Sequence, residues 1–127
     1  MLGQAEAITV DMVRLALDAA SMRHQAIANN IANVNTTAYK PATVNFEQQM
    51  DVIRAAMKQG DPIQANMLSG LQPFIERGAP HSEAERSALL DIEIANMAQN
   101  TVQYEALIKA LSKHMSLISS AIAEGKR

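Results

Sequence analysis

Apolar residues in the last third of the chain recur at strictly alternating steps of four and three. Only Thr101 breaks the apolar character of this row, which consists of Leu90, Ile94, Met97, Thr101, Tyr104, Ile108, Leu111, Met115, Ile118 and Ile122. Such steps average 3.5 residues, which is the repeat of a coiled-coil seam. Ser82 and Glu85 match a capping box, and Gly125 is a typical stop signal. The pattern predicts one long helix over residues 82–124.

A second long helix is predicted over residues 1–36. One apolar stripe of this helix runs through Ile8, Met12, Leu15, Ala19, Met22 and Ala26. A second stripe beside it runs through Val10, Val13, Leu17, Ala20, Ile27, Ile31 and Val34. Because two stripes exceed the width of a two-stranded seam, we expect neighbours on more than one side. A hairpin of the two terminal helices would leave one stripe of each uncovered, which indicates assembly with other chains.

The middle of the chain, residues 37–81, is predicted to be a loop region with one short helix at about residues 45–59. Asn45 is the expected N-cap of this helix, and Gly60 is its expected stop. The stretch after it holds three of the five Gly and three of the four Pro, which is typical of a long loop. The predicted fold class is therefore all-α, with two long terminal helices forming coiled-coil-like packing in a helical assembly.

Composition argues against several classes of function. The formal net charge is −2 and the only basic run is Lys126-Arg127, so no nucleic-acid partner is expected. Cysteine is absent, which removes disulfides and thiolate metal sites. No signal peptide or membrane-spanning segment is predicted, so a role outside the cytoplasm would need another export route. The three histidines are too scattered for a metal site, and we expect no enzyme activity, cofactor or metal.

Two segments, RHQAIANNIANVNTTAYK at residues 23–40 and MAQNTVQYEAL at residues 97–107, resemble parts of bacterial flagellar rod and hook proteins, the axial protein family. Residues 23–40, RHQAIANNIANVNTTAYK, are similar to a family signature that ends in A-N-N-I-A-N-x-N-T-P-G-Y-K and is followed by a Phe, here Phe46. Residues 97–107, MAQNTVQYEAL, are similar to the pattern M-A-x-N-x-x-x-Y-x-A-L. Thr37-Ala38 replaces the usual Pro-Gly, so the turn after the helix loses a φ-locking and a φ-permissive residue.

The resemblance implies a structural subunit of the proximal rod of the flagellar basal body. Such subunits lie in the periplasm, leave through the flagellar type III apparatus without a cleaved signal peptide, and form a hollow shaft that transmits torque and surrounds the export channel. The partners it implies are further copies of the chain, the rod proteins FlgC, FlgF and FlgG, the adaptor FliE, the membrane ring and the export gate. A FlgC-type subunit is the alternative within the family. A secreted helical hairpin or an export chaperone is the alternative outside it.

The predicted assembly interface follows the two helical seams and the Asn-rich end of the first helix. It comprises Ile8, Met12, Leu15, Met22, Asn29, Asn30, Ile31, Asn33, Leu90, Ile94, Met97, Tyr104, Ile108, Leu111, Met115, Ile118 and Ile122. Asn33 and Asn35 are expected to bond backbone groups at the helix end. Asn29 and Asn30 lie inside the helix, where their amides would either bond across a helix interface and fix its register or serve as ordinary polar positions.

Overall fold

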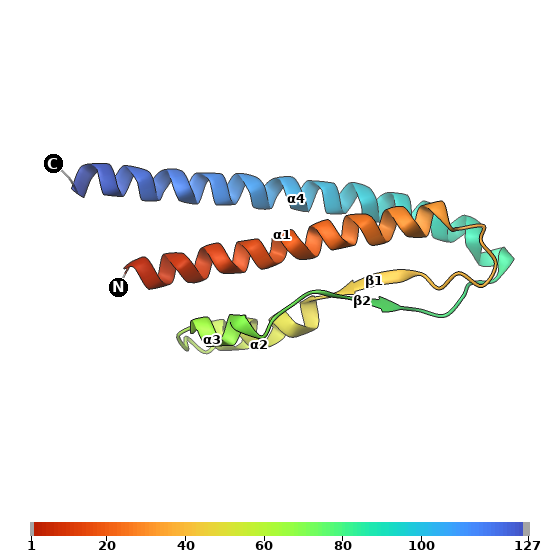
Figure 1. Ribbon diagram of the computed structural model, residues 1–127, viewed down its shortest axis with the longest axis horizontal. Helices are drawn as coiled ribbons and strands as arrows, with labels where there is room; N and C mark the ends of the chain where they lie inside the picture. The colour runs from red at the N-terminus through yellow and green to blue at the C-terminus, as the bar shows by residue number, and fades with distance from the viewer. Residues whose placement is uncertain (1, 126–127) are drawn as a thin grey trace.

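The computed structural model describes residues 2–125, apart from the side chains of Leu2, Gln4 and Ala5. Its elements, in chain order, are α1 (Leu2–Ala32), β1 (Ala42–Asn45), α2 (Glu47–Lys58), α3 (Ala65–Ser69), β2 (Phe74–Arg77) and α4 (Glu83–Gly125). Figure 1 shows α1 and α4 running antiparallel, with the chain ends on the same side. The segment from β1 to β2, which we call the arm, folds back along the opposite side of α1. Helix α1 is thus the middle layer of the molecule.

Small residues on α1 allow both neighbours to approach its backbone closely. Ala19 and Ala26 belong to the first predicted stripe, and they are buried in a cluster with Ala42, Val44 and Phe46 of the arm. Ala20 and Ile27 belong to the second stripe and are also buried. The Asn100 side chain of α4 donates a hydrogen bond to the Ala20 carbonyl, so α4 lies on this second side. Each stripe of α1 therefore has its own neighbour.

This arrangement corrects the argument that α1 must leave one stripe for other chains. The expectation of neighbours on more than one side is confirmed, but the second neighbour is the arm of the same chain. The arm could be missed because no local signal shows that it folds back onto α1, although Ile53 and Leu68 of the arm are also buried. Its part of the buried cluster is Ala42, Val44 and Phe46. Uncovered apolar surface is left on α4 instead.

The all-α prediction is incomplete, because the arm contains a small antiparallel sheet. Strand β1 pairs with β2 in a register that sets Ala42 opposite Arg77 and Asn45 opposite Phe74. Ala42 and Val44 point into the core and Thr43 is exposed, which is the alternation of a half-buried strand. All four residues of β2 are exposed. The region expected to be a loop after Gly60 thus contains both α3 and β2.

The ends of α2 agree in part with the sequence. The N-cap is Phe46 rather than Asn45, and no side chain caps the first turn. At the other end Gly60 has φ +74°, its N–H donates to the Met57 carbonyl, and the Asp61 N–H donates to the Ala56 carbonyl. This pair of bonds is a Schellman motif, which requires a left-handed residue after the helix and so explains the glycine.

The turn after α1 keeps the backbone shape that a glycine would favour. Helix α1 ends at Ala32, a few residues before the predicted end. Ala38, which stands in place of the family's Gly, has φ +63°. It is the only non-glycine residue with positive φ among residues 2–125. A left-handed conformation costs an L-residue about 1–2 kcal/mol, so the chain forms this turn at some cost in stability.

Candidate assembly interface

Asn30 is the residue that joins α1 to both of its neighbours. Its side chain is buried, and the Nδ2 group donates to the Ala42 carbonyl at 2.8 Å and to the Glu93 carboxylate of α4 at 3.4 Å. Its Oδ1 accepts from the Ala42 N–H at 2.8 Å and from the Tyr39 hydroxyl at 2.9 Å. All four hydrogen-bonding positions of the amide are used. Asn30 therefore fixes how β1, the exit turn and α4 sit on α1 within one chain.

The other asparagines at the end of α1 have simpler environments. Asn29 is exposed. Asn33 is half-buried, its Nδ2 donates to the Asn29 carbonyl at 2.9 Å, and its Oδ1 accepts from the Thr36 hydroxyl. The expectation that Asn33 bonds backbone at the helix end is confirmed. Of the two Asn residues inside the helix, only Asn30 bonds across a contact between elements.

The row of α4 that faces α1 most directly was not part of the predicted seam. It consists of Glu93, Asn100, Leu107 and His114, which are seven residues apart. Asn100 is only 3% exposed, and its Nδ2 donates to the Ala20 carbonyl at 2.8 Å. The Asn100 Oδ1 and the His114 Nε2 are buried and have no hydrogen-bond partner within the described part of the chain. Asn100 fits at this position because its side chain reaches the backbone of α1 at the small residue Ala20.

The predicted seam of α4 is consequently divided into two rows. One row is half-buried beside α1 and consists of Leu90, Met97, Leu111 and Ile118. The other row, which we call the open row, consists of Ile94, Ile108, Met115 and Ile122, with exposed fractions of 53%, 43%, 51% and 56%. Thr101 completes the seven-residue spacing of the open row. Tyr104 belongs to the half-buried row by its spacing but is itself 38% exposed.

The predicted interface residues of α1 fall on both of its sides. Leu15 and Met22 pack against the buried cluster shared with the arm. Ile8 and Met12 are half-buried nearer the N-terminus, and Ile31 is half-buried at the other end of α1. Leu15 and Met22 thus already have partners in the chain. The larger uncovered apolar surface lies on α4.

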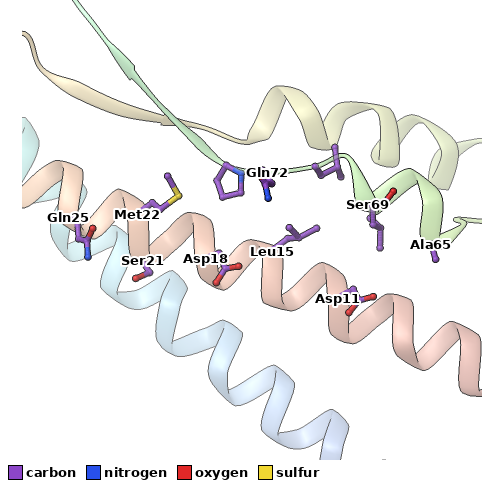
Figure 2. Close-up of a pocket in the computed structure, with 12 residues that line it drawn as sticks. Asp11, Leu15, Asp18, Ser21, Met22, Gln25, Ala65, Ser69 and Gln72 are labelled. Atoms are coloured by element: carbon purple, nitrogen blue, oxygen red, sulfur yellow. The ribbon is translucent and has the colours of Figure 1, made fainter.

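A groove runs between α1 and the segment from α3 to β2. It has a volume of about 660 Å³ and includes Asp11, Leu15, Asp18 and Met22 on its α1 side. Figure 2 shows these residues facing Ala65, Ser69 and Gln72 on the other wall. Gln49 of α2 supports that wall, because its side chain donates to the Gln72 carbonyl and accepts from the Gln72 N–H. Both walls are therefore anchored to the rest of the fold.

Comparison with known proteins places the chain in a family. The family model described as flagella basal body rod protein matches residues 14–40. The flagellar basal body rod protein FlgB of Borrelia hermsii is 30% identical over 120 residues, which cover 88% of this chain and 83% of that protein. The chain belongs to the FlgB family of flagellar basal body rod proteins. FlgB of Bacillus subtilis (strain 168) is 23% identical over 123 residues, covering 93% of this chain and 95% of that protein. No solved structure matches the chain.

The match to the rod-protein family coincides with the most connected part of α1. Residues 14–40 include the two α1 alanines of the core cluster, Asn30 and the exit turn. The Asn-rich segment that carried the resemblance thus has a structural role in this chain, which is to hold the arm and α4 against α1. Its predicted role in contacts between chains remains a proposal.

Neither a membrane span nor a metal site is found within residues 2–125. No helix there has the length and apolar character needed to cross a bilayer. No group of three or more potential ligands among those residues could hold a metal ion. His81 instead contacts the Glu85 carboxylate at 3.2 Å, next to the start of α4. Hydrogen bonding to His81 and to the Ser82 N–H lowers the pKa of Glu85 below its ordinary value.

Proposed function

We propose that this chain is a structural subunit of the proximal rod of the bacterial flagellar basal body. The observation that carries the proposal is the open row of α4, in a chain related over most of its length to FlgB proteins. Subunits polymerise through their terminal helices into a hollow shaft that transmits torque and surrounds the export channel. The chain has a mechanical role and catalyses no reaction.

The proposed partners follow from this place in the flagellum. They are further copies of the chain, the rod proteins FlgC, FlgF and FlgG, the adaptor FliE, the membrane ring and the export gate. The subunit would reach the periplasm through the flagellar export apparatus without a cleaved signal peptide. Both curated relatives described above bear the name FlgB, which favours this subunit type over the FlgC type.

The energetics of the open row support assembly. Burying a large aliphatic side chain contributes about 1.5–3 kcal/mol, and the four apolar residues of the open row are each about half exposed. A neighbouring helix that covered this row would therefore add several kcal/mol of apolar burial for each contact. The seven-residue spacing suits a partner that is itself a long helix, because knobs at that repeat insert into the holes of a facing helix.

The substitution Ile108→Asp tests the proposal. Ile108 is 43% exposed in the single chain, so the variant is expected to fold, but burial of its unpaired carboxylate in an assembly would cost several kcal/mol. We expect normal protein levels, loss of swimming in soft agar, and absence of the variant from purified basal bodies. Val52→Asp is the matched control, because Val52 is 65% exposed on α2, and swimming should be retained. Unchanged swimming by Ile108→Asp would mean that the C-terminal seam is not an assembly surface.

A secreted helical hairpin or an export chaperone is the contrasting class. Either of these would be recovered away from basal bodies, and neither would need a continuous apolar row on α4. Fractionation of cells that produce a tagged chain separates the classes. Co-purification with hooks and basal bodies supports the rod, whereas recovery in the soluble fraction alone contradicts it.

A further inference from the structure

The groove between α1 and α3 is acidic as well as partly apolar. Asp11 and Asp18 are its only charged lining residues, and both are exposed. Leu15, Met22 and Leu68 supply apolar side chains to the same groove. No ion pair within residues 2–125 neutralises these two carboxylates. A fitting occupant would present positive charge and an apolar side chain on one face.

One helical segment of this chain has that character. Residues 106–123 of α4 contain Lys109 and Lys113 and no acidic residue. The first part of α4, residues 83–105, contains five acidic residues and one arginine. Lys109 and Lys113 are exposed, and Leu117, which lies one turn beyond Lys113 on the same helix face, is 61% exposed. Residues 106–123 therefore combine basic and apolar exposed surface.

We propose that the groove between α1 and α3 receives residues 106–123 of α4 from a second copy of the chain. This inference rests on the proposed function and specifies one contact by which subunits join. Lys109 and Lys113 would lie near Asp11 and Asp18, and Leu117, the next residue on the same helix face, would meet Met22. The α1 wall from Asp11 to Gln25 is about 21 Å long and the segment about 26 Å long, so their lengths agree.

The positions of the two surfaces determine the kind of assembly. The groove lies on the arm side of α1, whereas α4 lies on the opposite side (Figure 1). A contact between two different surfaces is head-to-tail, and such a contact repeats into a ring or an open helical polymer instead of closing as a two-fold dimer. Each copy offers one groove and one α4 segment. A rod is an assembly of this kind.

Engineered cysteines test the contact directly, because the chain has none of its own. Ser69 lines the groove, and Ser112 is exposed on α4 between Lys109 and Met115. The variant carrying both Ser69→Cys and Ser112→Cys should form a ladder of disulfide-linked oligomers in basal bodies oxidised with copper phenanthroline. Each single variant alone should stay monomeric, and a mixture of the two should stop at dimers. The control, Ser69→Cys with Ser87→Cys, should give no ladder.

Charge reversal tests the chemistry of the same contact. Asp11→Lys with Asp18→Lys should reduce the ladder yield at least about fivefold, because like charges would then face each other. Lys109→Glu with Lys113→Glu should have a similar effect, and the four changes together should restore at least about half of the yield. Asp91→Lys, at an exposed position of α4 outside the groove, should leave the yield unchanged.

The outcomes separate this inference from the proposed function. If the double-cysteine chain is present in basal bodies and restores swimming but forms no ladder, the chain is a rod subunit and the groove contact is wrong. A cross-link from Ser69→Cys to another rod protein, or a dimer formed by Ser69→Cys alone, also overturns the groove contact. If the chain is absent from basal bodies altogether, the proposed function itself fails.

Discussion

The middle of α1 and the distal half of α4 differ in how completely one chain can bury them. Residues 19–30 of α1 have α4 on one side and the arm on the other, and Ala19 and Ala26 are each 1% exposed. Residues 106–123 of α4 touch α1 along one edge only, and Met115, Leu117 and Ile122 are all more than half exposed. The first region is buried by neighbours from its own chain, whereas the second has apolar surface that a single chain does not cover. Under the proposed function, folding depends on the middle of α1 and assembly on the distal half of α4.

The largest contrast is expected from truncating an apolar side chain in each region. Phe46 is 6% exposed in the cluster against α1, and Ile122 is 56% exposed on α4. Phe46→Ala should lower the free energy of unfolding by about 3–4 kcal/mol, whereas Ile122→Ala should change it by less than about 1 kcal/mol. Urea denaturation followed by circular dichroism measures both. Equal losses would mean that the distal half of α4 is as well packed as the core.

Removal of the Asn30 amide tests the polar junction on α1. Asn30→Ala leaves the buried N–H and carbonyl of Ala42 without their partner, which should cost about 2–4 kcal/mol in the same assay. Asn29→Ala is the matched control at an exposed neighbour and should be neutral or slightly stabilising, because Ala has the higher helix propensity. A small loss for Asn30→Ala would show that water readily replaces these bonds.

The exit from α1 offers a stabilising change. Ala38 has φ +63°, and Gly adopts this conformation without the steric cost of a Cβ atom. After allowing for the greater freedom of Gly in the unfolded chain, Ala38→Gly should raise the free energy of unfolding by about 0.5–1 kcal/mol. Ala28→Gly, at an exposed position inside α1, should instead lower it by about 1 kcal/mol. If Ala38→Gly and Ala28→Gly lowered the free energy of unfolding equally, Ala38 would not have a left-handed conformation.

The smallest effect is expected at the start of α4. The pKa of Glu85 is lowered by hydrogen bonding to His81 and the Ser82 N–H, so its ionised form favours the folded state. This contribution is present above the unfolded value of 4.5 and is lost as the pH falls through the lowered folded pKa. Amide exchange in the first turn of α4 should therefore speed up in acid more in the natural chain than in Glu85→Gln. If exchange in the natural chain and in Glu85→Gln depended equally on acid, Glu85 would not be the source of the effect.

The long helices could be predicted because their signals are local. The apolar repeat and the Ser82–Glu85 pair place the start of α4 within one residue of Glu83, and Gly60 correctly marks the end of α2. Ser82 and Glu85 also form half of the expected capping box, since the Ser82 N–H donates to the Glu85 carboxylate at 3.3 Å. These features depend on neighbours within one or two turns, which a sequence displays directly.

The sheet and the facing row of α4 depend on distant partners and could not be predicted in the same way. Strands β1 and β2 have four residues each and are far apart in the sequence. They are not joined by a tight turn, which is the usual sequence signal for a pair of antiparallel strands. On α4 the apolar repeat marked the seam from Leu90 to Ile122, but the residue buried most deeply against α1 is Asn100, which lies outside that seam. The pattern M-A-x-N-x-x-x-Y-x-A-L, whose fixed Asn is Asn100 in this chain, was a signal for this residue but not for its contact with α1.

Hydrogen–deuterium exchange on the isolated chain and on purified basal bodies tests the division between folding and assembly most directly. In the isolated chain, amides of residues 19–30 should be strongly protected and those of residues 106–123 should exchange at least about tenfold faster, because few buried contacts hold the distal helix. In basal bodies both regions should be protected. Equal protection of the two regions in the isolated chain, or continued fast exchange of residues 106–123 in basal bodies, would contradict the account.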